Sequence, residues 1–538
     1  MATVAEQLAR SLREVGTRYL FGVPSGGWID YMEAIRELDE LEFILVGHEG
    51  PGAVMADVCG RLTGAPGACF GTFGPGATNL ATGVGGALLD RSPLLAFTDE
   101  MPDHLLDRRV QMNIDHQALF RPLTKLTARL EADRVSEMVV EAARFATAEP
   151  PGPVHIGLPL GMASLDGVGE DARFHPAGAP PAPSPAVLER VEELFTGARN
   201  PLLAVGLTAT RFDVRSLIMK VAGEHRMPVV LTPMAKGMVP EDHPAYSGVL
   251  FHALSDEVAA THREADLVIA IGYDPVEFSY EEWLPEAPLV HIDTSPADID
   301  TSAHDLACDV VGDIKVALER LASIRTPGFD WDLDALAERR RVMFARLAPV
   351  PGVFGPRAAL AILREILPGE GIMVCDVGAH THLIGQMWPT PAPDRQLMTN
   401  GWSSMGFGIP AAIGARLSRP DQPVCAVVGD GGFLMSAGEL DVAKRLNLNV
   451  VFVILTDRSL SLIRIKQERK GHAVHGTPIR SGDHRLGESF LGVPVYGAAD
   501  PDAYRSALID AFDTDGPAIV EALIDGSEYD DLVLKRNR

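Results

Sequence analysis

A glycine-rich turn with an acid inside it is the feature of this sequence most able to do chemistry. The turn, Gly429-Asp430-Gly431-Gly432, follows the apolar run Val424–Val428 and precedes a helical pattern over Ser436–Leu446. Glycines let backbone N–H groups approach a phosphate, and the N-terminus of a helix favours an anion. Taken alone, the same turn could be an ordinary strand–helix crossover with one capping acid, so the interpretation needs support from elsewhere.

A second acid follows the next apolar run. Asp457 comes directly after Asn449–Leu455 and Thr456, and it stands 27 residues after Asp430. Because the carboxyl ends of parallel strands meet at one edge of a sheet, we expect both carboxylates at that edge. Two carboxylates and nearby backbone carbonyls beside a diphosphate are typical of a Mg²⁺ site.

Two common nucleotide-binding signatures are missing from the sequence. No GxxxxGK[ST] motif occurs, which disfavours a P-loop. Neither the turn at Gly429 nor the stretch Gly74-Pro75-Gly76-Ala77-Thr78 continues to the last glycine of a nicotinamide-binding turn. A nicotinamide oxidoreductase is therefore disfavoured.

The composition predicts folded domains that could position these acids. Of the 538 residues, 46% are hydrophobic and 22% are charged, which excludes a disordered chain. The formal net charge of −26 disfavours nucleic acid and anionic membranes as partners. The five cysteines have no CxxC spacing and lie in apolar runs, so we expect buried thiols rather than disulfides or zinc ligands. The amphipathic N-terminal pattern is not a signal peptide, and no apolar run is long enough to span a membrane, so we expect a cytoplasmic chain.

Two proline-rich stretches divide the chain. His175–Val187 and Leu347–Arg357 predict boundaries between segments 1–180, 181–345 and 346–538, each of single-domain size. All three segments alternate short apolar runs with helical patterns, which is typical of buried parallel strands joined by helices. The predicted fold class is α/β, with three doubly wound parallel-sheet domains.

The first and third segments repeat one pattern. In each, a helix leads through a proline-marked turn to an apolar strand and then to a glycine-rich turn; the helices carry Gly60-Arg61-Leu62 and Gly414-Ala415-Arg416-Leu417. We therefore expect two related sheets and a site at the interface between them.

These motifs together resemble the thiamine-diphosphate (ThDP)-dependent enzymes, nearest to the acetolactate synthase and pyruvate oxidase-like family. His48-Glu49-Gly50, Gly74–Asn79, Gly401–Gly408 (GWSSMGFG) and GDGG followed by Asp457 match that family's cofactor-binding segments. The stretch Ile271–Phe278 (IGYDPVEF) resembles the catabolic acetolactate synthase-like branch. The resemblance covers nearly the whole chain and implies the family's pyrimidine-binding, middle and diphosphate-binding domains, in that order.

The resemblance implies two catalytic residues. Glu49 matches the glutamate that donates a proton to the cofactor's pyrimidine ring, and Met405 matches the bulky apolar residue that bends the cofactor. It implies Mg²⁺ bound by Asp430, Asp457 and the carbonyl of Ser459. The implied cofactor-binding residues are Glu49, Pro75, Asn79, His380, Ser403, Met405, Asp430, Gly431, Gly432, Asp457, Ser461 and Leu462.

The sequence departs from the commonest family pattern at the metal-binding and flavin-binding positions, and more so in the acceptor pocket, at Met112 and Lys466. Thr456-Asp457 stands where Asn-Asn is typical, and Asp still suits Mg²⁺. Tyr273-Asp274-Pro275-Val276 stands where flavin-binding members carry an Arg-Phe-Asp-Asp-like stretch, so we expect no FAD.

The resemblance implies a carboligase that decarboxylates a 2-oxo acid such as pyruvate and joins the remainder to a second carbonyl, giving an acetolactate-type 2-hydroxy ketone. A nonoxidative 2-oxo acid decarboxylase and a carbon–carbon-cleaving lyase or hydrolase remain alternatives, as does a catalytically silent ThDP-fold binding protein. Candidate substrate residues are Gln111, Met112, His116 and Lys466, of which Lys466 could equally be a solvated helix residue. The resemblance also implies a homodimer or homotetramer in which Glu49 reaches the cofactor across a subunit interface.

Overall fold

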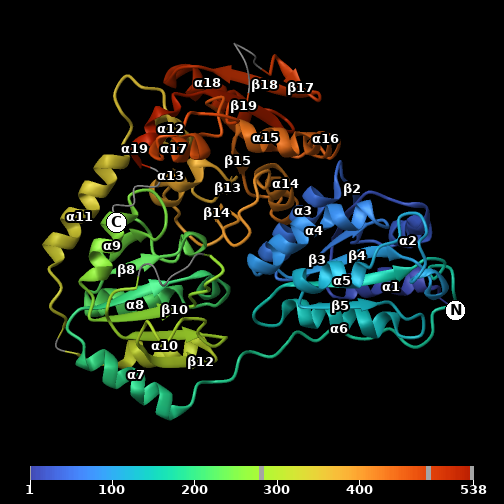
Figure 1. Cartoon of the computed structure of the whole chain (residues 1–538), viewed down its shortest axis with the longest axis horizontal. Helices are drawn as coiled ribbons and strands as arrows, with labels where there is room; N and C mark the ends of the chain where they lie inside the picture. Colours follow the sequence, from blue (N-terminus) through green and yellow to red (C-terminus); the bar gives the residue numbers. More distant parts are fainter. Residues whose placement is uncertain (1, 278–283, 327, 480–485, 533–538) are drawn as a thin grey trace.

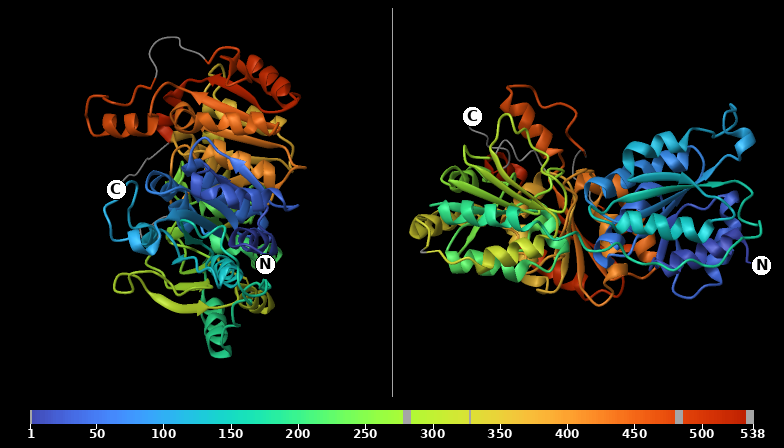
Figure 2. Two further views of the ribbon diagram at one scale, coloured as in Figure 1. Left: turned by 90° about the vertical axis from the view of Figure 1, so that its right-hand side faces the viewer. Right: turned by 90° about the horizontal axis from the view of Figure 1, so that it is seen from below.

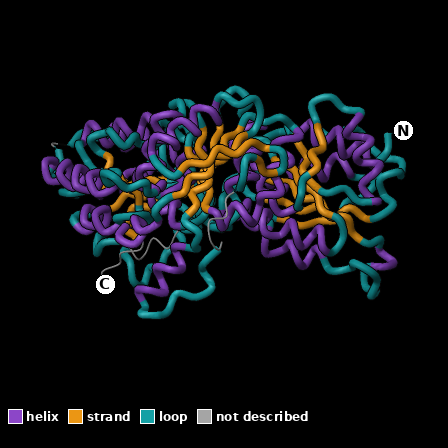
Figure 3. The backbone as a smooth tube through the Cα atoms, turned by 90° about the horizontal axis from the view of Figure 1, so that it is seen from above, coloured by secondary structure: helices purple, strands orange, loops and turns teal. Residues whose placement is uncertain are grey.

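The computed structural model describes residues 2–277, 284–326, 328–479 and 486–532. In this part of the chain the strands form three separate sheets with helices around them (Figure 3). Each sheet belongs to one segment of the sequence, so that first, middle and third units follow one another along the chain (Figure 1). The α/β prediction with three parallel-sheet domains is confirmed.

The first unit is a parallel sheet covered by helices on both faces. Helices α1 (Val4–Glu14) and α6 (Val135–Thr147) share a core with one face, and α3 (Glu49–Thr63) and α4 (Pro75–Leu89) pack on the other. The strand order is β2 (Glu42–Leu45), β1 (Tyr19–Gly22), β3 (Gly67–Gly71), β4 (Leu94–Glu100), β6 (Pro153–Pro159), β5 (Leu126–Arg129).

The third unit repeats the strand order of the first. Its sheet runs β14 (Gln396–Leu397), β13 (Ile372–Cys375), β15 (Val424–Gly429), β16 (Val450–Thr456), β19 (Ala518–Leu523), β18 (Val493–Ala498), and the antiparallel β17 (Ser489–Phe490) is added at the edge. In both units the six parallel strands, numbered in sequence order, therefore lie in the spatial order 2-1-3-4-6-5. The helices of this unit are α12 (Pro356–Ile366), α13 (Ala379–Met387), α14 (Gly408–Ser418), α15 (Asp430–Ser436), α16 (Leu440–Arg445), α17 (Ser461–Arg469), α18 (Pro501–Phe512) and α19 (Tyr529–Leu532).

The middle unit has a different strand order. Its sheet runs β12 (Leu306–Val311), β11 (Leu289–Asp293), β10 (Leu267–Ile271), β7 (Pro201–Val205), β8 (Val229–Leu231), β9 (Tyr246–Val249). The helices around it are α7 (Pro185–Gly197), α8 (Arg215–His225), α9 (Ser255–Arg263), α10 (Ile314–Ser323) and α11 (Leu333–Leu347). Numbered within the unit, this is the order 6-5-4-1-2-3 of dinucleotide-binding sheets.

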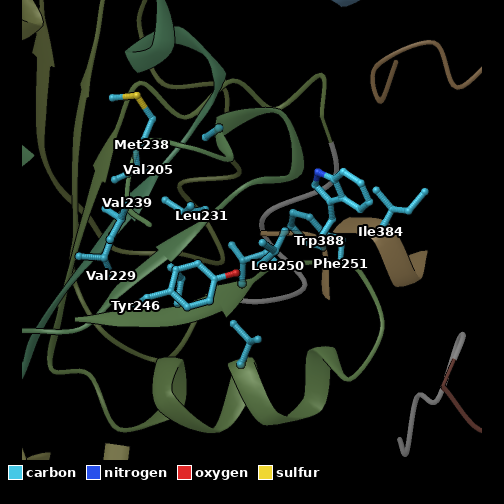
Figure 4. Close-up of a cluster of buried hydrophobic side chains, with 14 of the residues drawn as sticks. Val205, Val229, Leu231, Met238, Val239, Tyr246, Leu250, Phe251, Ile384 and Trp388 are labelled. Carbon is cyan, nitrogen blue, oxygen red and sulfur yellow. The ribbon is translucent and has the colours of Figure 1, made fainter. Parts of the chain in front are cut away.

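The third unit contacts both others (Figure 2). Its α14 packs along α3 of the first unit so closely that a Cβ added at Gly414 would lie 2.7 Å from the Met55 carbonyl oxygen. On the other side, Ile384 and Trp388 pack against Leu250 and Phe251 of the middle unit (Figure 4). The two repeated units therefore pack through equivalent helices, and their shared core is apolar.

Most of the expected elements are present, with one correction. The helix after the acid-containing turn begins at Asp430 itself, not at Ser436, because Gly429 takes the extended N-cap conformation and the carboxylate favours the first helical turn. The five cysteines are free and buried, as expected. The predicted domain boundaries were not tested and stay predictions, although each sheet lies inside one of the three segments. Among the described residues, no helix is both long and apolar enough to cross a membrane.

Candidate active site

Asp430 and Asp457 follow neighbouring parallel strands. β15 and β16 pair in register, with Gly429 opposite Leu455, so both acids leave the sheet at the same edge. Asp430 is only 1% exposed, and its Oδ2 accepts the Arg458 N–H at 2.8 Å. Asp457 accepts the Ser461 hydroxyl and the Ser459 N–H, and burial raises the pKa of its carboxyl.

A cavity of about 110 Å³ opens between these acids and the neighbouring loops. Its lining includes most of the residues that the sequence assigned to the diphosphate and metal: His380, Met405, Asp430, Gly431, Gly432, Asp457, Ser459, Ser461 and Leu462. The structure thus collects around one hollow a set that spans more than 80 residues of sequence.

His380 has an unsatisfied ring nitrogen at this cavity. The residue lies in the first turn of α13 and is 3% exposed, and its Nε2 is buried with no hydrogen-bond partner. Burial lowers the pKa of its imidazole to about 4, so the ring is neutral at physiological pH. His380 lines the cavity, and a buried polar atom without a partner is expected where a polar ligand group or an ordered water completes the hydrogen bond.

Asp376 is a further acid at this edge that the sequence analysis did not single out. It directly follows β13, and its Oδ1 accepts the N–H groups of Gly406 and Phe407 at 3.0 and 3.1 Å. It is fully buried, and burial raises its pKa to about 7. Asp376 therefore holds the loop that carries Met405. Its position after the run Ile372–Cys375 was the available sequence signal.

Glu49 begins helix α3 and is 7% exposed. The Asn79 side-chain amide, from α4, donates to Glu49 Oε2 at 2.9 Å. His48 caps the same helix by accepting the Gly50 N–H at its Nδ1. Two of the family-matched residues of the first unit, Glu49 and Asn79, are therefore directly hydrogen-bonded.

A second cavity, of about 310 Å³, connects this part of the first unit with the third. His48, Gly50 and Asn79 line one side, and Ser404, Met405 and Gly406 line the other. Met405 borders both cavities, and its Cε would lie 3.2 Å from a Cβ added at Gly431. Met405 thus separates the Glu49 side of the site from the Asp430 side.

Glu439 links the two units beside this cavity and was also missed from the sequence. Its buried carboxylate accepts the Gly47 N–H at 3.1 Å, across 392 residues of sequence, and burial raises its pKa to about 7. The contact lies within one chain. The prediction that a partner subunit supplies Glu49 is not tested by a single chain and stays a prediction.

Seven predicted residues are absent from the described lining of both cavities: Glu49 and His116, which are buried, and Pro75, Ser403, Gln111, Met112 and Lys466, which are exposed. Pro75 starts α4, whose fifth residue is Asn79. Ser403 adopts a left-handed conformation (φ 53°) two residues before Met405. The Met112 carbonyl packs against Gly74, where a Cβ would lie 2.8 Å from it.

His116, a candidate substrate residue, is buried in a hydrogen-bond chain. The Gly74 N–H donates to its Nε2 at 3.2 Å, and its Nδ1 pairs with the Thr98 hydroxyl at 2.9 Å. Thr98 in turn pairs with His155. In this position His116 holds the glycine turn after β3, and burial lowers its pKa to about 4.

The residues present fit a magnesium-bound diphosphate. The carboxylates of Asp430 and Asp457 are hard oxygen donors, and Gly431 and Gly432 supply backbone amides in the first turn of α15. Among the described residues, no group of three or more His, Cys, Asp or Glu side chains is arranged to hold a metal ion, so a metal here would need carbonyl or ligand oxygens as well.

Three family models match the chain in order. They describe the N-terminal TPP binding domain (residues 2–119), the central domain (188–321) and the C-terminal TPP binding domain (376–522) of thiamine pyrophosphate enzymes. Thiamine pyrophosphate is another name for ThDP.

Curated relatives match over nearly the whole chain. A probable acetolactate synthase large subunit from Methanocaldococcus jannaschii is 29% identical, with 97% of this chain and 92% of that protein aligned. A catabolic acetolactate synthase from Raoultella terrigena is 29% identical, with 97% and 95% aligned. An acetolactate synthase from Bacillus subtilis is 27% identical, with 97% and 93% aligned. The family models, these relatives and the geometry agree: the chain belongs to the thiamine pyrophosphate enzymes, and it is acetolactate synthase-like.

Proposed function

We propose that this protein is a ThDP- and Mg²⁺-dependent carboligase that decarboxylates a 2-oxo acid such as pyruvate and joins the remainder to a second carbonyl, forming an acetolactate-type 2-hydroxy ketone. The observation that carries the proposal is Met405, which borders one cavity lined by Asn79, the hydrogen-bond partner of Glu49, and another lined by Asp430 and Asp457. The resemblance of residues 271–278 to catabolic members and the catabolic relative from Raoultella terrigena favour the catabolic type.

The cofactor supplies a carbanion nucleophile and an electron sink for decarboxylation when it is bound. Asp430 and Asp457 would hold Mg²⁺, together with the carbonyl of Ser459. Diphosphate oxygens would accept hydrogen bonds from the backbone amides of Gly431 and Gly432 and from the Nε2 of His380, which has no protein partner.

The chain would contribute two things to catalysis: a carboxyl group that exchanges a proton, and an apolar side chain that packs against the cofactor. The Glu49 carboxyl would exchange a proton with the pyrimidine ring, and Asn79 fixes its Oε2 so that the other oxygen remains available. Asp376 and the packing against Gly431 would keep Met405 in place between the two halves of the cofactor.

Incubation with pyruvate alone, ThDP and Mg²⁺, followed by mass analysis of the products, tests this function. Acetolactate supports the carboligase, and pairs of 2-oxo acids then define the donor and the acceptor. Acetaldehyde as the only product would replace the proposal by a nonoxidative decarboxylase. If no 2-oxo acid is consumed although ThDP binds, the silent binding protein or a lyase acting on another substrate takes its place.

A further inference from the structure

The middle unit has the topology of a dinucleotide-binding domain. Such sheets bind a dinucleotide where the strand order reverses, here between β7 and β10. The diphosphate then sits on the amides of the turn after the first strand. In this chain that turn is residues 206–211, which follow β7.

The amides of this turn are already bonded to another segment of the chain. The Leu207 N–H donates to Glu277 Oε2 at 3.0 Å, and the Thr208 N–H donates to the Gly272 carbonyl at 2.9 Å. The second oxygen of the same carboxylate, Glu277 Oε1, accepts the Met234 N–H at 2.8 Å from the turn after β8. One carboxylate thus takes the donors of two adjacent turns, as a bound phosphate would.

The space beside the turn after β7 is filled by the chain itself, in addition to the hydrogen bonds that its amides make. Glu277 is 2% exposed. A Cβ added at Gly206 would lie 2.6 Å from both the Gly272 oxygen and the Tyr273 Cα. The backbone of residues 272–273 therefore occupies the space that the missing side chain of Gly206 leaves open. At the end of β8, where dinucleotide sites usually carry an acid for the ribose, this chain has Thr232.

The same segment also reaches the other two units. Arg91, at the end of α4 in the first unit, forms a two-point ion pair with Asp274, with Nη2 and Oδ1 3.0 Å apart. The Asn400 side chain of the third unit donates to the Glu277 carbonyl. Residues 272–277 therefore connect all three units at the position that a bound dinucleotide would occupy.

We propose that residues 272–277 are a built-in substitute for a dinucleotide, in which the Glu277 carboxylate occupies the diphosphate position, so that the middle unit takes neither FAD nor another dinucleotide. The expected absence of FAD acquires a physical cause in this way, because the donors that would hold it are saturated. The inference does not depend on the proposed reaction, since it is tested by binding without turnover.

The first test is direct titration of the wild-type protein with FAD and with ADP, followed by flavin fluorescence and by calorimetry. We expect no binding of either probe. Saturable binding of FAD or of ADP by the wild-type protein, or flavin copurifying with it, would overturn the proposal whatever the variants show.

The second test removes the carboxylate. Glu277→Ala should lower the melting temperature by several degrees, because two buried amides lose their acceptor. The same change should create ADP binding, with an affinity at least about tenfold above that of the wild type, and ADP should raise the melting temperature of the variant only. If Glu277→Ala does not accumulate as folded protein, the isosteric Glu277→Gln is measured in the same way, with a smaller ADP-dependent shift expected.

Glu241→Ala is the matched control. Glu241 is another buried acid of the middle unit, and it accepts the Thr390 N–H at 3.0 Å and pairs with Lys236. We expect this variant to lose stability without responding to ADP. A folded Glu277 variant that binds ADP no better than the wild type, or an equal ADP response in Glu241→Ala, would show that Glu277 does not occupy a phosphate position.

Discussion

Two glycine-rich turns occupy equivalent places in the first and third units, but their surroundings differ. Both follow the third strand of a sheet with the order 2-1-3-4-6-5, and both start a helix: α4 after β3 and α15 after β15. In the first turn, the Gly74 N–H is capped by the neutral ring of His116. In the second, Asp430 begins the helix and lies at the cavity that it shares with Asp457.

Topology sets where a site can form, and a few side chains decide which chemistry that site can perform. The turn capped by His116 is satisfied by the protein itself, and its helix α4 contributes Asn79, the hydrogen-bond partner of Glu49. The turn at Asp430 keeps acidic oxygens at a cavity and suits a metal. We therefore expect proton transfer on the side of the first unit and metal binding on the side of the third.

Removing the acid on the first side should have the largest effect on turnover. Glu49→Gln keeps the shape and the Asn79 contact but loses the exchangeable proton, so kcat should fall by about 10²- to 10⁴-fold while ThDP still binds. Steady-state kinetics and a ThDP titration measure the two quantities. Turnover close to the wild-type value would remove Glu49 from the mechanism.

Removing the acid on the second side should act on cofactor binding first. Asp430→Ala should weaken Mg²⁺-dependent ThDP binding by about 100-fold or more, because a direct metal ligand matters at least as much as its supporting residues. Calorimetric titration at several Mg²⁺ concentrations gives this value. The matched control is Asp457→Asn, which restores the family's commoner ligand and should stay within about tenfold of the wild type.

Mixing the two inactive variants tests whether the two sides come from one chain. Residues 160–184, which contain no helix or strand, connect the first unit to α7 and could let it pack on a neighbouring chain (Figure 1). If Glu49 acts across subunits, coexpressed Glu49→Gln and Asp430→Ala chains should recover up to about a quarter of wild-type activity, since one site of each mixed dimer is intact. If each site is built within one chain, no activity returns, and the predicted subunit interface is wrong.

The smallest effect should come from the histidine cap and should be seen in stability. Burial lowers the pKa of His116 from 6.5 to about 4, so its neutral form is the one that folding favours. The stabilisation is therefore fully present above pH 6.5 and is lost as the pH falls from 6.5 towards 4. The charge of Asp115 raises the pKa of His116 and that of Arg129 lowers it, both by less than burial does. His155, which shares Thr98 with His116, also has a pKa lowered by burial and by His116.

Melting temperatures measured by calorimetry between pH 4.5 and 7.5 test this cap. His116→Gln should melt at a lower temperature at pH 7.5 and should show a shallower fall in acid than the wild type. An unchanged pH dependence in the variant would mean that other groups, such as His155, account for the acid sensitivity.

The sequence predicted the strands well because strands covered on both faces are continuous apolar runs. Val424–Val428 is one residue short of β15, and Asn449–Leu455 is offset by one residue from β16. The start of α15 was misplaced because Gly431 and Gly432 are poor helix formers, and only the surrounding packing makes them helical. Asp376 and Glu439 were missed because a lone acid carries no pattern, and the partner of Glu439 lies 392 residues away.

Local spacing alone was enough to determine the α/β class, the two related sheets and the edge where Asp430 and Asp457 emerge. Periodicity and the alternation of strands and helices along the chain depend on neighbouring residues, so these features can be read from the sequence. The tertiary structure decided that His116 caps a turn instead of facing a cavity, that Met405 borders two cavities, and that Glu277 saturates the amides of the middle unit. Burial and hydrogen-bond partners depend on segments far apart in sequence, and only the folded chain brings them together.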